Sequence, residues 1–313
     1  MNFLIKRKLH IAALLCVVAI LVAALSISVS RNNRLVLPFA ERAKPQVPSD
    51  PFANLSLEAK AAYVVDLTDK KVLFAKDAEE VLPLASLTKL VSVIVATDFL
   101  PAQTSIPITS ADLTADGDTG LFPGEKWVFD ALTKFSLITS SNDGITAIAS
   151  VAGAQIASST NPDLDDVFVQ TMNGVMTRLG FSDMRFYNPT GLDESSTTSG
   201  GYGSARDVAG ILSYLLKNHP DLIEVTGEGT TTFDSDLAVH VAANTDEALP
   251  YIPRVIASKT GYTNLAGGNL AVILDAGLMH PVALVVLGSS YDGRFSDMEN
   301  LAAAATKALA DKQ

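Results

Sequence analysis

The chain is poor in cysteine, in paired histidines and in basic residues, and each shortage excludes a class of protein. Its 313 residues include one cysteine, so no intramolecular disulfide can form and a cysteine-rich zinc site is excluded. The four histidines, at positions 10, 219, 240 and 280, show none of the close spacings of metal-binding pairs such as HExxH. We therefore expect a protein without a metal or another cofactor.

Basic residues are outnumbered by acidic ones. Lys and Arg total 23 against 34 Asp and Glu, which gives a net charge of −11 at pH 7. Because phosphate contacts need clustered lysine and arginine, we expect no nucleic-acid partner. Hydrophobic residues make up 48% of the chain and charged residues 18%, which excludes a disordered chain.

Acidic clusters at positions 112, 116 and 118 and at positions 163, 165 and 166 could suggest calcium binding. Neither cluster matches the spacing of an EF-hand loop. We interpret both as solvated loops.

The first 30 residues are predicted to be separate from the fold. Lys6, Arg7 and Lys8 belong to a basic segment, residues 1–8, and an apolar segment without carboxylates follows, residues 9–30. About 20 apolar residues can cross a bilayer as one helix, with the basic end kept in the cytoplasm. This predicts contact with a membrane and an extracytoplasmic location for the rest of the chain. A cleaved signal peptide and an uncleaved anchor both remain open, and the length of the apolar run favours the anchor.

Residues 31–55 contain four prolines and scattered charges, which predicts an extended linker. The folded domain is then expected over residues 56–313. Without the three basic residues of the first segment, 20 basic and 34 acidic residues remain, a net charge of −14. Such an acidic domain suits a solvent-facing site outside the cell.

Hydrophobic periodicity predicts strands at both ends of this domain and helices between them. Strands are expected at residues 61–66 and 72–76, joined by a tight turn, and again at 255–258, 269–274 and 282–288. Helices are expected after Pro83 and over residues 129–137, 144–157, 205–216 and 296–310. We predict an α/β domain of the α+β type, in which helices flank an antiparallel sheet built from both chain ends and a helical subdomain lies between.

The first chemical motif is Ser86-Leu87-Thr88-Lys89, the only SxxK in the chain. Residues three apart share one face of a helix, so the hydroxyl and the amine can meet. A serine hydroxyl needs an adjacent base to act as a nucleophile, and a desolvated lysine can be that base. The plain alternative is that Ser86 caps the helix and Lys89 is exposed.

The second motif is Ser140-Ser141-Asn142, an SxN. Two other segments match this pattern, but only Ser140 lies between two predicted helices. A short turn there can direct both polar side chains into a cleft. The alternative is an ordinary polar turn.

The third motif is Lys259-Thr260-Gly261, a KTG at the end of the predicted strand 255–258. A strand with a free edge can pair with an extended peptide, and a lysine and a hydroxyl could bind its carboxylate. Gly261 would let a substrate backbone approach closely. The alternative is a strand end followed by a turn glycine.

The order SxxK, SxN, KTG, on a helix, an inter-helix turn and a strand, is specific where each motif alone is not. It is the signature of penicillin-binding proteins and serine β-lactamases. Within that group the chain resembles the D-alanyl-D-alanine carboxypeptidases of the low-molecular-mass penicillin-binding proteins. The matching segments are Ala85–Leu90, Pro123–Glu125, Ser140–Asp143, Asn188–Leu192, Ser204–Asp207 and Lys259–Thr263.

The resemblance implies a β-lactamase/transpeptidase-like fold and a serine peptidase that acts on peptidoglycan stem peptides. Ser86 would attack the carbonyl of the penultimate D-alanine and form an acyl-enzyme, and Lys89 would accept its proton. Ser140 would relay a proton to the leaving amine. Asn142 would orient Lys89 and the substrate amide. A β-lactam would acylate Ser86 by the same route.

The resemblance also assigns substrate binding to the third motif. Lys259 and Thr260 would hold the terminal carboxylate beside Gly261. The backbone N–H groups of Ser86 and Tyr262 would form the oxyanion hole. One departure from the family pattern is Ala257, where glycine is common.

Family members often carry a further β-rich domain and a C-terminal amphipathic membrane helix. The 52 residues after Gly261 suffice here for the rest of the sheet and one helix. We therefore expect the N-terminal segment to provide any anchor.

Three alternative functions share features with this pattern. A D,D-endopeptidase shares the whole motif set. A class A β-lactamase needs a glutamate in an ExxLN segment, which is absent between Asn142 and Lys259, so we expect slow loss of a bound β-lactam. A non-catalytic wall-binding or β-lactam-sensing domain is disfavoured because all three motifs are complete.

Overall fold

The computed structural model describes residues 16–21, 50–117, 119–157, 164–277 and 279–310. The chain divides into two compact units, residues 1–49 and 50–313, and we treat each by itself. In the first unit, residues 16–21 are helical. The rest of the predicted apolar segment 9–30, and the linker up to residue 49, lie outside the described residues. No helix among the described residues has the length and apolar character needed to cross a membrane.

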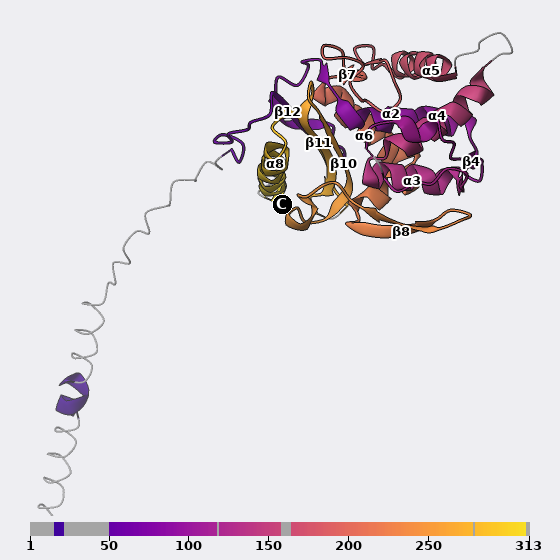
Figure 1. Ribbon diagram of the computed structural model, residues 1–313. Helices are drawn as coiled ribbons and strands as arrows, with labels where there is room; N and C mark the ends of the chain where they lie inside the picture. The colour runs from indigo at the N-terminus through magenta and orange to yellow at the C-terminus, as the bar shows by residue number, and fades with distance from the viewer. Residues whose placement is uncertain (1–15, 22–49, 118, 158–163, 278, 311–313) are drawn as a thin grey trace, which may run out of the picture. The chain divides into compact units, whose positions relative to one another are not determined.

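A five-stranded antiparallel sheet with the order β10–β11–β12–β1–β2 lies at the centre of the second unit (Figure 1). Two strands come from the beginning of this unit, β1 (Ala61–Asp66) and β2 (Lys71–Lys76). Three come from its end, β10 (Val255–Thr263), β11 (Gly267–Asp275) and β12 (Pro281–Ser289). Since β1 pairs with both β2 and β12, the predictions of an N-terminal hairpin and of a sheet built from both chain ends are confirmed.

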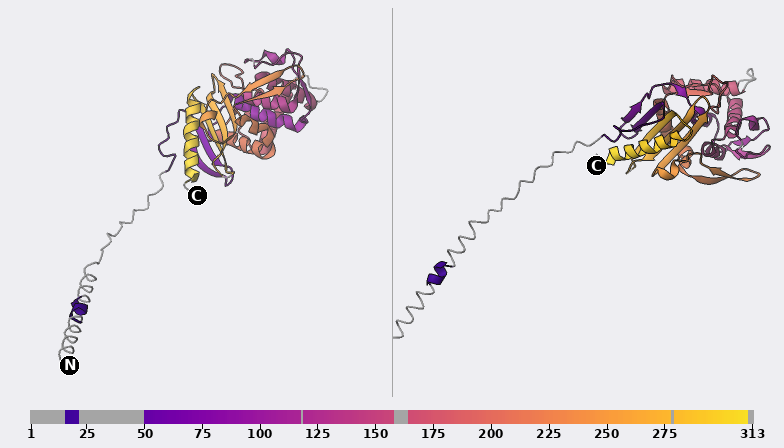
Figure 2. Two further views of the ribbon diagram at one scale, coloured as in Figure 1. Left: turned by 90° about the horizontal axis from the view of Figure 1, so that it is seen from below. Right: turned by 60° about the vertical axis from the view of Figure 1, so that its left-hand side comes forward.

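Both faces of the sheet are covered. Helix α8 (Gly293–Ala310) lies against one face, and α6 (Ala205–Asn218) and the other large helices lie on the opposite side (Figure 2). Successive side chains of β1 alternate between two hydrophobic cores: Tyr63 belongs to the core shared with α6, and Val64 to the core shared with α8. A strand buried on both faces explains why this segment is apolar at nearly every position.

The helical subdomain contains α2 (Thr88–Phe99), α3 (Phe129–Thr139), α4 (Asn142–Ile156) and α5 (Leu164–Leu179). The first nine residues of α2 are all buried, because this helix contacts α3, α4, α5 and α6. The five predicted helices are thereby confirmed as α2, α3, α4, α6 and α8.

The shorter elements are β3 (Leu82–Pro83), η1 (Ala85–Leu87), β4 (Ser105–Pro107), η2 (Asp112–Thr114), β5 (Lys126–Val128), β6 (Arg185–Phe186), β7 (Gly201–Gly203), α7 (Pro220–Ile223), η3 (Glu224–Gly227), β8 (Thr230–Asp234), β9 (Val239–Ala243) and η4 (Leu249–Tyr251).

The interpretation of the acidic segments as solvated loops holds for exposed Asp116 but is wrong for buried Asp112 and for Asp165 and Asp166, which are helical. Residues 164–179 form α5, whose buried Phe168, Met172 and Met176 recur at helical spacing. Asp112 is buried and accepts hydrogen bonds from the Thr109 backbone N–H (2.7 Å) and hydroxyl (2.6 Å). Among the described residues, no group of three side chains could hold a metal ion.

The compact unit begins earlier than the predicted domain. Phe52, within the predicted linker, is buried and stacks on Phe74 of β2 with ring centroids 5.4 Å apart. Residues 50–55 therefore pack with the domain.

Candidate active site

The SxxK motif lies where β3 passes into α2. Ser86 occupies the 3₁₀ turn η1, directly after Ala85, whose φ of +48° places a non-glycine residue in the left-handed region. Lys89 is in the first turn of α2, and its Nζ lies 2.8 Å from Ser86 Oγ. The plain alternative is wrong on both counts: Leu87, not Ser86, is the N-cap, and Lys89 is 0% exposed.

The Lys89 amine is held by two further oxygens. Its Nζ donates to Asn142 Oδ1 at 2.7 Å and to the Thr190 carbonyl oxygen at 2.8 Å. Burial, and then the charge of nearby Lys259, lower the pKa of Lys89 well below that of a free lysine. The amine is therefore poised to be neutral and to accept a proton.

The SxN motif forms the turn between α3 and α4. Ser140 adopts a left-handed conformation with φ of +60°, which ends α3, and Ser141 caps α4 by accepting from the Gly144 N–H at 3.0 Å. Asn142 then begins α4 and directs its amide oxygen at Lys89. The prediction that this turn lies between two helices is confirmed.

The KTG motif lies within β10, an edge strand of the sheet. It pairs with β11, with Lys259 opposite Ala271 and Gly261 opposite Asn269. The prediction that the strand ends before the motif is wrong, because the ladder continues to Thr263. Ala257, the departure from the family pattern, is fully buried in this strand.

Lys259 connects this strand to the SxN turn. Its Nζ donates to Ser140 Oγ at 2.8 Å and to the Thr260 carbonyl oxygen at 2.9 Å. Burial, followed by the nearby Arg294 guanidinium, lowers the pKa of Lys259 to about 7, although the Asp246 carboxylate opposes the shift. Ser86, Lys89 and Asn142 thus form one set of polar contacts, and Ser140 and Lys259 form a second set, whose lysine charge acts on Lys89.

Gly261 allows β10 to approach the turn that carries Ser86. A Cβ at this position would lie 3.0 Å from the Leu84 carbonyl oxygen and 3.2 Å from the Ser86 nitrogen. Next to it, the Thr260 hydroxyl bonds the Thr245 hydroxyl, and the Tyr262 side chain is 46% exposed. The backbone of the third motif therefore lies directly beside Ser86.

Three site residues were missed from the sequence. Arg294 of α8 is buried, donates to the Gly261 carbonyl oxygen at 3.3 Å and lies 4.3 Å above the Tyr291 ring. Buried Asp246 accepts a hydrogen bond from Ser258 beside the motif. Asp193 accepts from the Thr263 hydroxyl at 2.9 Å. Only Asp193, directly after the matching segment Asn188–Leu192, carried a sequence signal.

Comparison with known proteins agrees with this geometry. Residues 44–290 match the model of peptidase family S11, D-alanyl-D-alanine carboxypeptidase. The chain belongs to this family.

The sequence identity between this chain and individual members of the family is modest. The chain is 31% identical over 267 residues to the D-alanyl-D-alanine carboxypeptidase DacF of Bacillus subtilis, which covers 82% of this chain and 64% of that protein. It is 28% identical to a D-alanyl-D-alanine endopeptidase of Escherichia coli, covering 81% of this chain and 79% of that protein. The chain thus spans less than two thirds of the length of the first relative.

A solved structure supports the predicted fold. Penicillin-binding protein D2 of Listeria monocytogenes, in its cefotaxime-bound form, superimposes with a TM-score of 0.67 at 25% identity, over 80% of this chain and 98% of that one. The prediction of a penicillin-binding, transpeptidase-like fold is confirmed.

Proposed function

We propose that this family member is a serine-type D-alanyl-D-alanine carboxypeptidase that removes the terminal D-alanine from peptidoglycan stem peptides. The observation that supports it most is the environment of Lys89 Nζ. A neutral amine has two N–H bonds and one lone pair. The Asn142 and Thr190 oxygens can only accept hydrogen bonds, so they take both N–H bonds and leave the lone pair facing Ser86 Oγ.

The reaction follows from these positions. Ser86 Oγ attacks the carbonyl carbon of the penultimate D-alanine, and its proton passes to Lys89. Charge on the carbonyl oxygen is stabilised by the backbone N–H groups of Ser86 and Tyr262. Ser140 gives its hydroxyl proton to the nitrogen of the departing D-alanine as the peptide bond breaks, and the proton held by Lys89 then restores the Ser140 hydroxyl. Water then cleaves the ester on Ser86, releasing the shortened peptide.

Lys259 and Thr260 hold the terminal carboxylate of the substrate in this proposal. The contact between Lys259 Nζ and Ser140 Oγ, 2.8 Å, also lets the lysine charge act on the proton that Ser140 delivers. Asn142 orients both Lys89 and the substrate amide. A β-lactam presents a reactive carbonyl and a carboxylate in the same arrangement, so it would acylate Ser86.

The first test is the intact mass of the purified protein after addition of benzylpenicillin. We expect one added penicillin per chain in the wild type and none in Ser86→Ala, with both proteins folded by circular dichroism. The wild type should also release D-alanine from a peptide ending in D-Ala-D-Ala. A folded wild type without an adduct would refute the proposal and favour a non-catalytic wall-binding domain.

A second candidate is a D,D-endopeptidase that cuts peptidoglycan cross-links. The observation that favours it is the E. coli endopeptidase, of which the chain covers a larger share than it does of DacF. Digestion of purified cross-linked dimers beside monomeric pentapeptides separates the two activities. Faster loss of the dimers would assign the endopeptidase.

A β-lactamase is the less favoured alternative. Without the ExxLN glutamate that activates water, the penicillin adduct should persist for many turnovers of the peptide substrate. Rapid consumption of benzylpenicillin with only a transient adduct would show a β-lactamase instead.

We also propose that residues 9–30 direct the chain across the cytoplasmic membrane of a bacterium, as an anchor or a cleaved signal. The support is the apolar run behind Lys6, Arg7 and Lys8. Residues 31–49 would then lead to an extracytoplasmic catalytic domain. Extraction of cell membranes with carbonate and mass analysis of the N-terminus distinguish the two forms: an anchor stays with the membrane at full length, and a signal is absent from the mature chain.

A further inference from the structure

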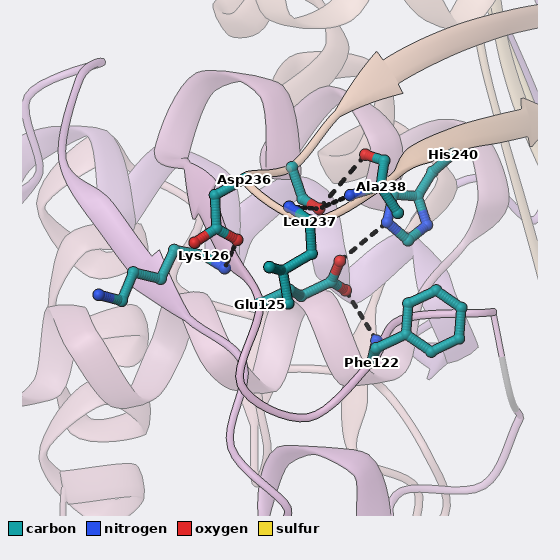
Figure 3. Close-up of polar contacts among 8 residues, drawn as sticks. Phe122, Glu125, Lys126, Asp236, Leu237, Ala238 and His240 are labelled. Atoms are coloured by element: carbon teal, nitrogen blue, oxygen red, sulfur yellow. Dashed lines mark hydrogen bonds and ion pairs between the residues drawn. The ribbon is translucent and has the colours of Figure 1, made fainter.

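Glu125 and His240 form a buried ion pair outside the polar contacts of the SxxK, SxN and KTG motifs (Figure 3). The Glu125 side chain is 0% exposed, and its Oε2 lies 2.8 Å from His240 Nε2. The imidazole is surrounded by aromatic rings, with centroids 4.7 Å away for Trp127 and 5.9 Å for Phe135. Moving both groups out of water costs free energy, which good pairing geometry and further hydrogen bonds must offset.

The pair fixes one end of a long loop. Glu125 Oε1 accepts from the Phe122 N–H at 2.7 Å, which closes a turn ahead of β5. Ile108 receives a hydrogen bond from the Gly124 N–H and donates to the Glu125 carbonyl oxygen, so the two ends of the loop meet. His240 lies on β9, and the hairpin tip next to it is also tied to β5 by two bonds between Lys126 and Asp236. We call residues 108–117 and 119–125 the bracing loop.

Hydrogen bonding supports an ionised Glu125. Burial by itself would raise the pKa of this carboxyl, but the bond from the Phe122 N–H, and then smaller contributions from side chains that include Ser235 and His240, hold it below its usual value. A carboxylate only accepts, so His240 Nε2 must carry a proton and donate. Removing the His240 donor would leave the buried Glu125 carboxylate with one hydrogen bond fewer.

The same loop touches the SxN motif. The Asp116 carbonyl oxygen accepts from Asn142 Nδ2, and the Thr119 hydroxyl lies 2.7 Å from the Ser141 hydroxyl. An amide side chain presents an acceptor on one side and a donor on the other. Because Asp116 accepts from Nδ2, the Asn142 oxygen is forced to face Lys89 Nζ.

Loss of this acceptor would free the Asn142 amide to rotate. Its NH₂ group could then face Lys89 and take the lone pair that Ser86 needs. The orientation of one amide group therefore links the bracing loop to the base.

We propose that Glu125 and His240 are positioning residues for the acylation step, which act through the bracing loop and the Asn142 amide on Lys89. The proposal rests on the proposed function. It predicts an effect on the rate of acylation rather than on substrate binding, because the hydrogen bonds and ring contacts of the two residues in the described structure lead to the bracing loop and its neighbours and not to β10.

The test uses the full chain and a fluorescent penicillin, with the acylation rate constant k2 and the dissociation constant of the non-covalent complex measured separately. His240→Phe keeps an aromatic ring but removes the donor, and should lower k2 by about 10- to 100-fold with little change in the dissociation constant. His240→Gln can still donate to Glu125 and should recover most of k2.

A second histidine–carboxylate pair, in which the His280 side chain is 29% exposed, provides the control. His280 Nε2 lies 2.6 Å from Asp66 Oδ2 at the end of β1, where it contacts no residue of the SxN turn in the described structure. His280→Phe should cost stability in a similar way but leave k2 unchanged. If His240→Phe does not fold, Glu125→Asp, which shortens the carboxylate by one methylene, takes its place with a smaller fall in k2.

A double-mutant comparison identifies the route. In an Asn142→Ala background, the Glu125 and His240 substitutions should have no further effect on the residual k2. A wild-type k2 in folded His240→Phe, or a fall equal to that of His280→Phe, would overturn this inference alone. Failure of the wild type to be acylated would overturn the proposed function and this inference together.

Discussion

The protonation states of the two lysines in the site depend more on burial than on any single neighbouring residue. Lys89 and Lys259 are both almost fully buried, and each has a lowered pKa with desolvation as its first cause. The effect on function is different for the two. A neutral Lys89 can take a proton from Ser86, whereas a neutral Lys259 loses the charge that would attract a carboxylate.

This difference predicts an alkaline limit for penicillin binding. Lys259, with a pKa of about 7, is protonated below that pH and neutral above it. The second-order rate of acylation by benzylpenicillin should therefore fall as the pH rises through about 7. Benzylpenicillin methyl ester, which has no carboxylate, should show no such fall. Parallel profiles for the two compounds would contradict the assignment of Lys259 as the carboxylate-binding cation.

Fixed spacing along the chain predicts the motif residues but not their surroundings. The structure places Lys89 against Ser86 and Asn142, and Lys259 against Ser140. Arg294 and Asp246 reach the same site only through tertiary packing. No spacing could reveal a residue whose position depends on how α8 packs against the sheet.

At the scale of elements, the turn that carries Ser86 depends on close contact with the loop that follows β6. Gly191, with φ of +83°, lies so close to this turn that a Cβ would be 1.9 Å from the Ala85 carbonyl oxygen. The same loop provides the Thr190 oxygen for Lys89. Displacing this loop should therefore disturb both the Ser86 nucleophile and the Lys89 base.

Gly191→Ala should therefore lower the free energy of unfolding by more than about 2 kcal/mol and slow acylation by at least about tenfold. Gly180→Ala is the control, because Gly180 also has a positive φ, +92°, but no atom lies within 4 Å of a Cβ there. It should cost only the backbone strain, about 1 kcal/mol, and acylate normally. Denaturant unfolding and penicillin acylation of the folded fraction measure both effects. Equal losses in the two variants would argue against the contact with Ala85.

Element prediction worked where periodicity was clear and failed where charge was misinterpreted. The apolar run of β1 and the helical spacing of α2 reported their structures correctly. In α5 the apolar spacing was equally present at Phe168, Met172 and Met176, but Asp165 and Asp166 at its start were interpreted as part of a loop. Acidic residues in a first helical turn are favourable to the helix dipole, so the same residues should have marked a helix start.

For the whole molecule, the buried lysines are a cost to stability. An unfolded lysine has a pKa of about 10.4, so a folded pKa near 7 for Lys259 means that the folded state binds fewer protons. Stability is then highest above the unfolded pKa, falls as the pH drops towards about 7, and is level below it.

Lys259→Met should consequently raise the free energy of unfolding at pH 7 by about 1 to 3 kcal/mol, although it removes activity. The gain should shrink towards pH 10. Exposed Lys71 gives the control, since Lys71→Met should change stability little at either pH. Thermal unfolding at both pH values measures the difference. A less stable Lys259→Met would show that the hydrogen bonds of this lysine outweigh its burial.

The pairing of β1 with β12 has a consequence for how the protein is made. Ala61 lies in register opposite Leu287, so the middle of the sheet joins residues from opposite ends of the folded unit. A nascent chain lacks this pairing until nearly all of it has left the ribosome, and the β1–β2 hairpin alone is marginal in water. A polypeptide that crosses a membrane as an extended chain would thus bring its first and last strands together only on the far side, and folding would follow translocation.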